Sequence, residues 1–161
     1  MRNSLKSLVR FSHPRRLPSG ERGQSLVEFS VIGVFLTVLL MGVADLGRAY
    51  FTYLALKDAA AEGAYFGAVY PACTSASDPE CASPNNVEYR IKNSAPQGSL
   101  VDWSTVGIDL EATTLTPGDS LTVTVTYQYP LITPLVGTIV GSQNLTLKAE
   151  SVAVILSEAM P

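Results

Sequence analysis

The chain has 161 residues, 47% of them hydrophobic, and a formal net charge of −3. This length suffices for one domain, and a strongly apolar stretch in the first third leaves only a small part for a water-soluble core. After Gly23 the chain has five basic and thirteen acidic residues. This acidity argues against nucleic acid as a partner, because a polyanion requires a basic surface.

Residues 1–23 are predicted to form a basic leader. They contain six Lys or Arg residues and one acidic residue, Glu21. Pro14 and Pro18 would interrupt a helix there. Basic residues that flank a membrane segment remain cytoplasmic, so we expect the N-terminus inside the cell and the C-terminal part outside.

A continuous helix is predicted from Gln24 to about Val69, because no proline follows until Pro71. No charged residue lies between Glu28 and Asp45. This interval spans about 25 Å as a helix, and the hydrocarbon core of a bilayer is about 30 Å thick. The segment is therefore expected to cross a membrane once, in contact with lipid.

The second half of this helix, beyond Asp45, is amphipathic and should leave the lipid to support the soluble part. Gly63 and Gly67 lie four residues apart among alanines and permit close approach of another element, which we expect to be the protein's own sheet. An outer aromatic belt is expected at Tyr50, Phe51 and Tyr53.

Cys73 and Cys81 follow the helix, in a stretch rich in Pro, Ser, Asn and Asp that is typical of a loop. In an oxidising compartment they would form a disulfide, whereas in a cytoplasmic domain they would be free thiols. The charge distribution favours the disulfide. A short helix is predicted to follow Asn86 and to end near Ser94.

Alternating apolar residues then predict three strands, around residues 106–110, 121–127 and 145–156. A turn is expected at residues 116–119. In the last strand the alternation changes phase, which predicts a bulge or a bend near Glu150. We therefore expect an α+β fold in which a long transmembrane and stem helix packs against a small antiparallel sheet. The predicted domains are a leader at 1–23, the helix at 24–70 and an extracytoplasmic domain at 71–161.

A motif marks the boundary between leader and helix. Gly23 is followed by Gln24 and, at the fifth position, by Glu28, with Phe29 opening the apolar run. Residues 22–29, with Asp45-Leu46-Gly47-Arg48 and residues 59–64, resemble the TadE-like family, the pseudopilins or minor pilins of tight-adherence (Flp-type) pili. This resemblance covers residues 22–69.

The resemblance implies cleavage between Gly23 and Gln24 by a prepilin peptidase, and a role in pilus assembly for Glu28 and Phe29. A carboxylate in the apolar zone costs about 2.5–3.5 kcal/mol at the membrane centre, so it calls for a partner. In pilin-like assemblies that partner would be the new amino group of a neighbouring subunit. The alternative is that Glu28 lies at the interface and reaches water.

The implied partners are membrane lipid, the peptidase, other pilins or pseudopilins and the pilus secretion machinery. Asp45 and Arg48 lie on one helical face and either form an ion pair or mark where the helix leaves the lipid.

Catalysis is poorly supported, because the only histidine, His13, lies in the leader. We predict no enzymatic activity, no cofactor and no metal site. Two other functions stay open. The chain could be a secreted binding module, released by signal peptidase at Gly42-Val43-Ala44, or a sensor domain tethered by an uncleaved anchor.

Overall fold

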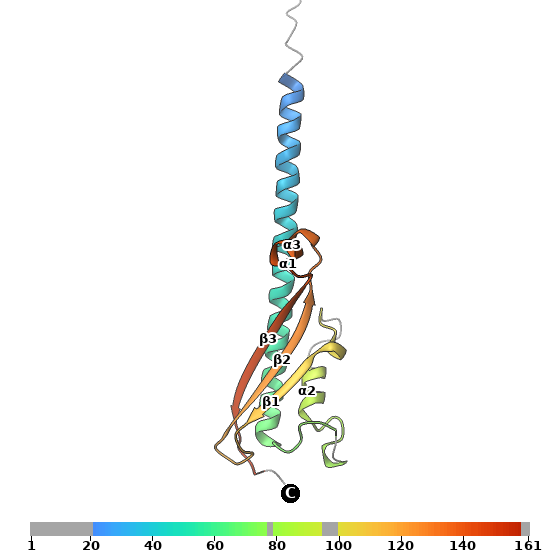
Figure 1. Ribbon diagram of the computed structural model, residues 1–161. Coiled ribbons are helices and arrows are strands. Elements are labelled where there is room, and N and C mark those ends of the chain that lie inside the picture. The colour runs from blue at the N-terminus through green and yellow to red at the C-terminus, as the bar shows by residue number, and fades with distance from the viewer. Residues whose placement is uncertain (1–20, 77–78, 95–99, 159–161) are drawn as a thin grey trace, which may run out of the picture. The chain divides into compact units, whose positions relative to one another are not determined.

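The computed structural model describes residues 21–76, 79–94 and 100–158. Its longest element is helix α1, Glu21–Val69, drawn in blue to green in Figure 1. This confirms the predicted continuous helix, which begins at Glu21 rather than Gln24. The leader prediction for residues 1–20 lies outside the described residues. The chain divides into two units, residues 1–39 and residues 40–161, and the described part of the first is helix alone.

The second unit contains a three-stranded antiparallel sheet with the order β1-β2-β3. Its strands are β1 (Gly107–Ala112), β2 (Ser120–Pro130) and β3 (Asn144–Val154). Along β2 every second residue is buried, because successive side chains of a strand point to opposite faces of the sheet. The long helix with this sheet confirms the predicted α+β fold. The buried residues of β2 are Leu121, Val123, Val125, Tyr127 and Tyr129.

The predicted bulge near Glu150 is wrong. β3 pairs with β2 in one unbroken register along its whole length. The phase change in the sequence has another cause, because Val152 and Val154 lie on the outer face, where they are 59% and 53% exposed. The inner face continues through the small residues Ala149 and Ala153. The apolar residues Val152 and Val154 on the exposed face therefore produce the phase change in the sequence, although the strand register is unbroken.

The core of the second unit lies between the inner face of the sheet and the second half of α1. Leu56 is its largest fully buried helical side chain. A Cβ atom on Gly63 would lie 2.6 Å from Ile91 Cδ1, and one on Gly67 would overlap Leu121. These two glycines let other elements approach α1 closely, and the contact of Gly67 with β2 confirms that the protein's own sheet uses this face. The buried alanines of α1 are Ala49, Ala59, Ala60, Ala64 and Ala68.

Short elements complete the second unit. Helix α2, Val87–Asn93, packs on α1. Its N-cap is Asn86, whose side chain accepts a hydrogen bond of 2.7 Å from Tyr89 N. The predicted turn at 116–119 is confirmed, because Asp119 N donates to Thr116 O and Gly118 has a φ of 99°. The remaining elements are the 3-10 turns η1 (Pro79–Cys81) and η2 (Trp103–Thr105) and helix α3 (Pro134–Val140).

Candidate assembly and processing site on the N-terminal helix

The predicted processing site lies in the first turn of α1. The peptide bond between Gly23 and Gln24 is helical, and no described atom lies within 4 Å of a Cβ built on Gly23. The side-chain amide of Gln24 donates a hydrogen bond of 3.3 Å to Glu28 Oε1, and both side chains are exposed. The bond is thus unobstructed by packing in the described part of the chain, although a peptidase would need the first turn to unwind. Cleavage there stays a prediction.

Glu28 stands at the start of an exposed apolar helix face. Phe29 beside it is 76% exposed, and in the described residues no basic side chain forms a salt bridge with Glu28. The Gln24 amide is neutral and leaves the carboxylate charge uncompensated. A partner for Glu28 in another subunit stays a prediction.

The apolar half of α1 satisfies its own polar groups. The hydroxyls of Ser30 and Thr37 donate to the carbonyl oxygens of Leu26 and Gly33, at 2.7 Å and 2.8 Å. In lipid there is no water to take these bonds, so satisfaction within the helix is required. In the described part of the chain, α1 is the one helix long and apolar enough to cross a membrane.

Asp45 ends the apolar stretch and is buried, with 4% of its surface exposed. Its Oδ2 accepts a hydrogen bond of 2.8 Å from the backbone nitrogen of Thr133. Arg48, one turn further along α1, adds an electrostatic attraction. Within the described ranges the two side chains form no direct salt bridge, and an ion pair between them stays a prediction. Asp45 instead ties the connection between β2 and β3 to α1.

Arg48 extends toward the sheet, where its guanidinium lies 5.9 Å from the ring centroid of Tyr129. This is the distance of a weak cation–π contact. Burial raises the pKa of the Tyr129 phenol above its ordinary value, so the group stays neutral at physiological pH. Its hydroxyl and that of Thr52 are buried without a hydrogen-bond partner among the described residues. Arg48, Thr52 and Tyr129 form a polar cluster between α1 and β2. This cluster therefore contributes packing and electrostatic attraction more than hydrogen bonds.

The two cysteines follow the end of α1, and the structure joins Cys73 to Cys81 by a disulfide. The backbone carbonyl of each cysteine also accepts a hydrogen bond. Val87 N donates to the carbonyl of Cys73 at 3.0 Å, and the amide of Asn86 donates to the carbonyl of Cys81 at 2.9 Å. The disulfide thus fixes the start of α2 against the end of α1.

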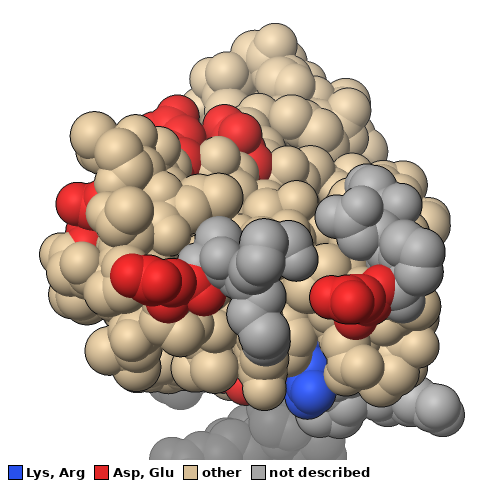
Figure 2. All heavy atoms as spheres, turned by 90° about the horizontal axis from the view of Figure 1, so that it is seen from below, with Lys and Arg blue, Asp and Glu red and all other residues tan. Residues whose placement is uncertain are grey.

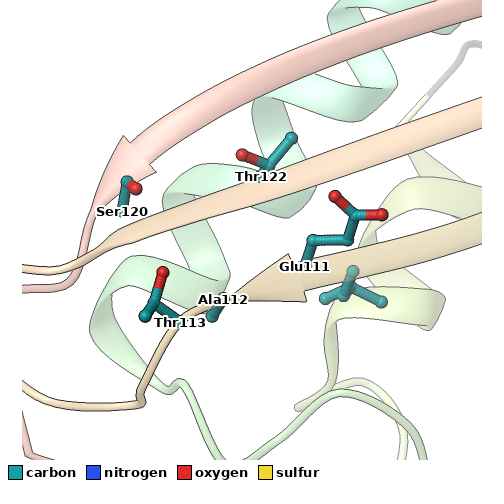
Figure 3. A pocket seen from close by; sticks show the side chains of 6 residues that line it. Glu111, Ala112, Thr113, Ser120 and Thr122 are labelled. Carbon is teal, nitrogen blue, oxygen red and sulfur yellow. The ribbon is translucent and has the colours of Figure 1, made fainter.

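An open hollow lies on the second unit where β1 ends and β2 begins (Figure 3). Glu111 is the one charged residue in its lining. No histidine or cysteine lines it. Across the described ranges, no group of three His, Cys, Asp or Glu residues could hold a metal ion. The other lining residues are Leu110, Ala112, Thr113, Ser120 and Thr122.

Comparison with known protein families places the match on α1. Residues 23–64 match the model of a family described as TadE-like protein, and this confirms the predicted resemblance to that family over this segment. The match covers about a quarter of the chain and includes Gln24, Glu28, Asp45 and Arg48. Neither the curated proteins nor the solved structures yielded a match.

Sequence reasoning missed the segment that Asp45 holds. Helix α3 was not predicted, although its boundary signals are present in the sequence. Thr133 occupies the N-cap position before Pro134, and Gly141 follows the helix with a φ of 80°. A proline in the first turn and a glycine just past the end are typical helix boundaries. These signals predict where the helix begins and ends. They do not predict the hydrogen bond between Thr133 and Asp45, because these two residues are 88 positions apart in the sequence.

Proposed function

We propose that this protein is a membrane-anchored pseudopilin or minor pilin that contributes to assembly of a tight-adherence (Flp-type) pilus. The observation that carries the proposal is the position of the family match, which covers the exposed apolar half of α1 and continues into its packed half. The matched segment therefore includes the exposed half of α1, which would contact lipid and other subunits. We assign no reaction to the chain, in keeping with a structural role.

The proposed topology follows from charge. The basic leader stays in the cytoplasm, α1 crosses the bacterial cytoplasmic membrane once, and the domain that begins near residue 71 is extracytoplasmic. A disulfide between Cys73 and Cys81 is compatible with that side of the membrane, which is oxidising.

Glu28 is proposed to set the register between neighbouring subunits. Cleavage after Gly23 by a prepilin peptidase would create an amino group on Gln24, one helical turn from the carboxylate. When helices pack side by side, the amino group of one subunit would pair with Glu28 of the next. Such a pair in an apolar setting is costly to break, because the remaining charge has no partner.

The experiment compares Glu28→Ala with the matched control Glu150→Ala, which removes an exposed carboxylate from β3. Membrane abundance, leader cleavage and pilus number are measured in each strain. We expect Glu28→Ala to insert and to be cleaved normally, because removing a charge from an apolar helix lowers its transfer cost. Pili should be lost in this strain and kept in the control. Wild-type pilus numbers in the Glu28→Ala strain would reject the pairing role.

A further inference from the structure

The connection between β2 and β3 has an unusual composition for a surface segment. It comprises residues 131–143 and includes α3, which lies beside α1 in Figure 1. No charged residue occurs anywhere between Asp119 and Lys148. At the opposite end of the second unit, seen from below in Figure 2, acidic side chains are scattered over a mostly uncharged face and outnumber the basic ones. The two ends of this unit therefore differ in charge.

Two contacts fix the position of α3 along α1. Thr133, the residue before α3, donates its backbone N–H to the buried carboxylate of Asp45. Val136 Cγ2 lies 3.9 Å from where a Cβ on Gly42 would be. Gly42 and Asp45 mark the end of the uncharged stretch of α1. Consequently α3 is held at the level where α1 would emerge from lipid.

This segment exposes several large apolar side chains. Ile132 and Ile139 are 64% and 79% exposed, and Val140 is 55% exposed. On α1, at the same level, Leu46 is 72% exposed. Isolated exposed apolar residues are ordinary, but a cluster of them without charges marks a surface that another apolar phase covers.

We propose that α3 lies in the outer interfacial layer of the membrane, with Ile139 and Val140 against the lipid acyl chains. Lipid is favoured over a protein as the occupant because α3 is held beside Gly42 and Asp45, where the uncharged stretch of α1 ends. Tyr50 and Phe51, 59% and 66% exposed, lie just beyond it, where interfacial aromatic residues are expected. The inference rests on the proposed membrane anchor. It adds a second lipid contact, which would fix the tilt and height of the extracytoplasmic domain.

The test uses tryptophan quenching by lipids brominated on the acyl chains. The full chain is reconstituted in phosphatidylcholine vesicles, and one tryptophan is added at a time, with Trp103 as the constant background. The variants are Ile139→Trp in α3, Leu36→Trp in the apolar half of α1, and Val152→Trp on the outer face of β3. The added fluorescence should be quenched in Ile139→Trp and in Leu36→Trp but kept in Val152→Trp.

Two results would overturn the inference, and they differ in meaning. If Leu36→Trp is quenched but Ile139→Trp keeps its fluorescence, α3 faces water or another protein, while the anchor and the proposed function stand. If Leu36→Trp is not quenched either, the anchor itself fails, and the proposed function fails with it.

Discussion

Between Leu26 and Leu40 the large side chains of α1 are exposed, whereas from Ala49 to Ala68 one face of the same helix is buried by the chain's own sheet and α2. The first half has large apolar side chains that are exposed in the described part of the chain. The second half has alanines and glycines where other elements approach. Side-chain size along one helix thus distinguishes an exposed surface, which we propose contacts lipid and other subunits, from one that packs in the protein's own core.

The largest loss of stability should come from shortening a buried side chain in the packed half of α1. Leu56→Ala is expected to lower the free energy of unfolding by about 2–5 kcal/mol, because Leu56 is fully buried. Leu36→Ala, in the exposed half, should leave it nearly unchanged. Denaturant titrations of the full chain in detergent, followed by Trp103 fluorescence, measure both. Equal losses of unfolding free energy in Leu56→Ala and Leu36→Ala would contradict the distinction between the packed and exposed halves of α1.

The disulfide closes the chain just beyond the packed half. Replacing Cys73 and Cys81 together by serine should cost about 2.5 kcal/mol of stability, from the entropy of a loop of this length. Its compartment is tested by alkylating freshly isolated membranes without reduction. Neither thiol should react in the unmodified protein. Full labelling of both would argue against the disulfide and weaken the proposed topology.

Close packing of the helix is tested by adding one methyl group. Gly63→Ala should destabilise the domain by about 1–3 kcal/mol, because the new Cβ would press against Ile91. Gly47→Ala is the matched control, since no described atom lies within 4 Å of its Cβ position. There the better helix propensity of alanine should add roughly 0.5–1 kcal/mol. Thermal unfolding of both variants should therefore shift in opposite directions.

The smallest effect concerns the polar cluster between α1 and β2. Tyr129→Phe removes a buried hydroxyl that has no hydrogen-bond partner among the described residues. It should leave the free energy of unfolding unchanged or slightly higher, because the desolvation of the hydroxyl is no longer required. The ring that faces Arg48 is retained. A loss above about 1 kcal/mol would mean that the hydroxyl makes a hydrogen bond in solution.

Local patterns predicted most of the fold. The lack of proline indicated α1, period-two alternation indicated the strands, and Asn86 indicated the start of α2. The bulge was wrong because Val152 and Val154 are apolar on an exposed face, which alternation alone does not reveal. The contact between Asp45 and Thr133 could not be predicted, because it joins segments far apart in the sequence and depends on how the sheet packs along α1. In the candidate site, the roles of Gly23 and Glu28 were predicted from the resemblance to the TadE-like family, and the partner that we propose for Glu28 belongs to another subunit.

We propose that α1 is a pilin-type helix whose N-terminus is created by cleavage after Gly23. The most direct measurement is mass spectrometry of the mature N-terminus, purified from membranes of the native host. We predict a chain that begins at Gln24, and an uncut precursor for Gly23→Leu. A mature chain that begins at Asp45 would indicate release by signal peptidase, and one that retains the leader would indicate a simple anchor. Either result would contradict the pilin account.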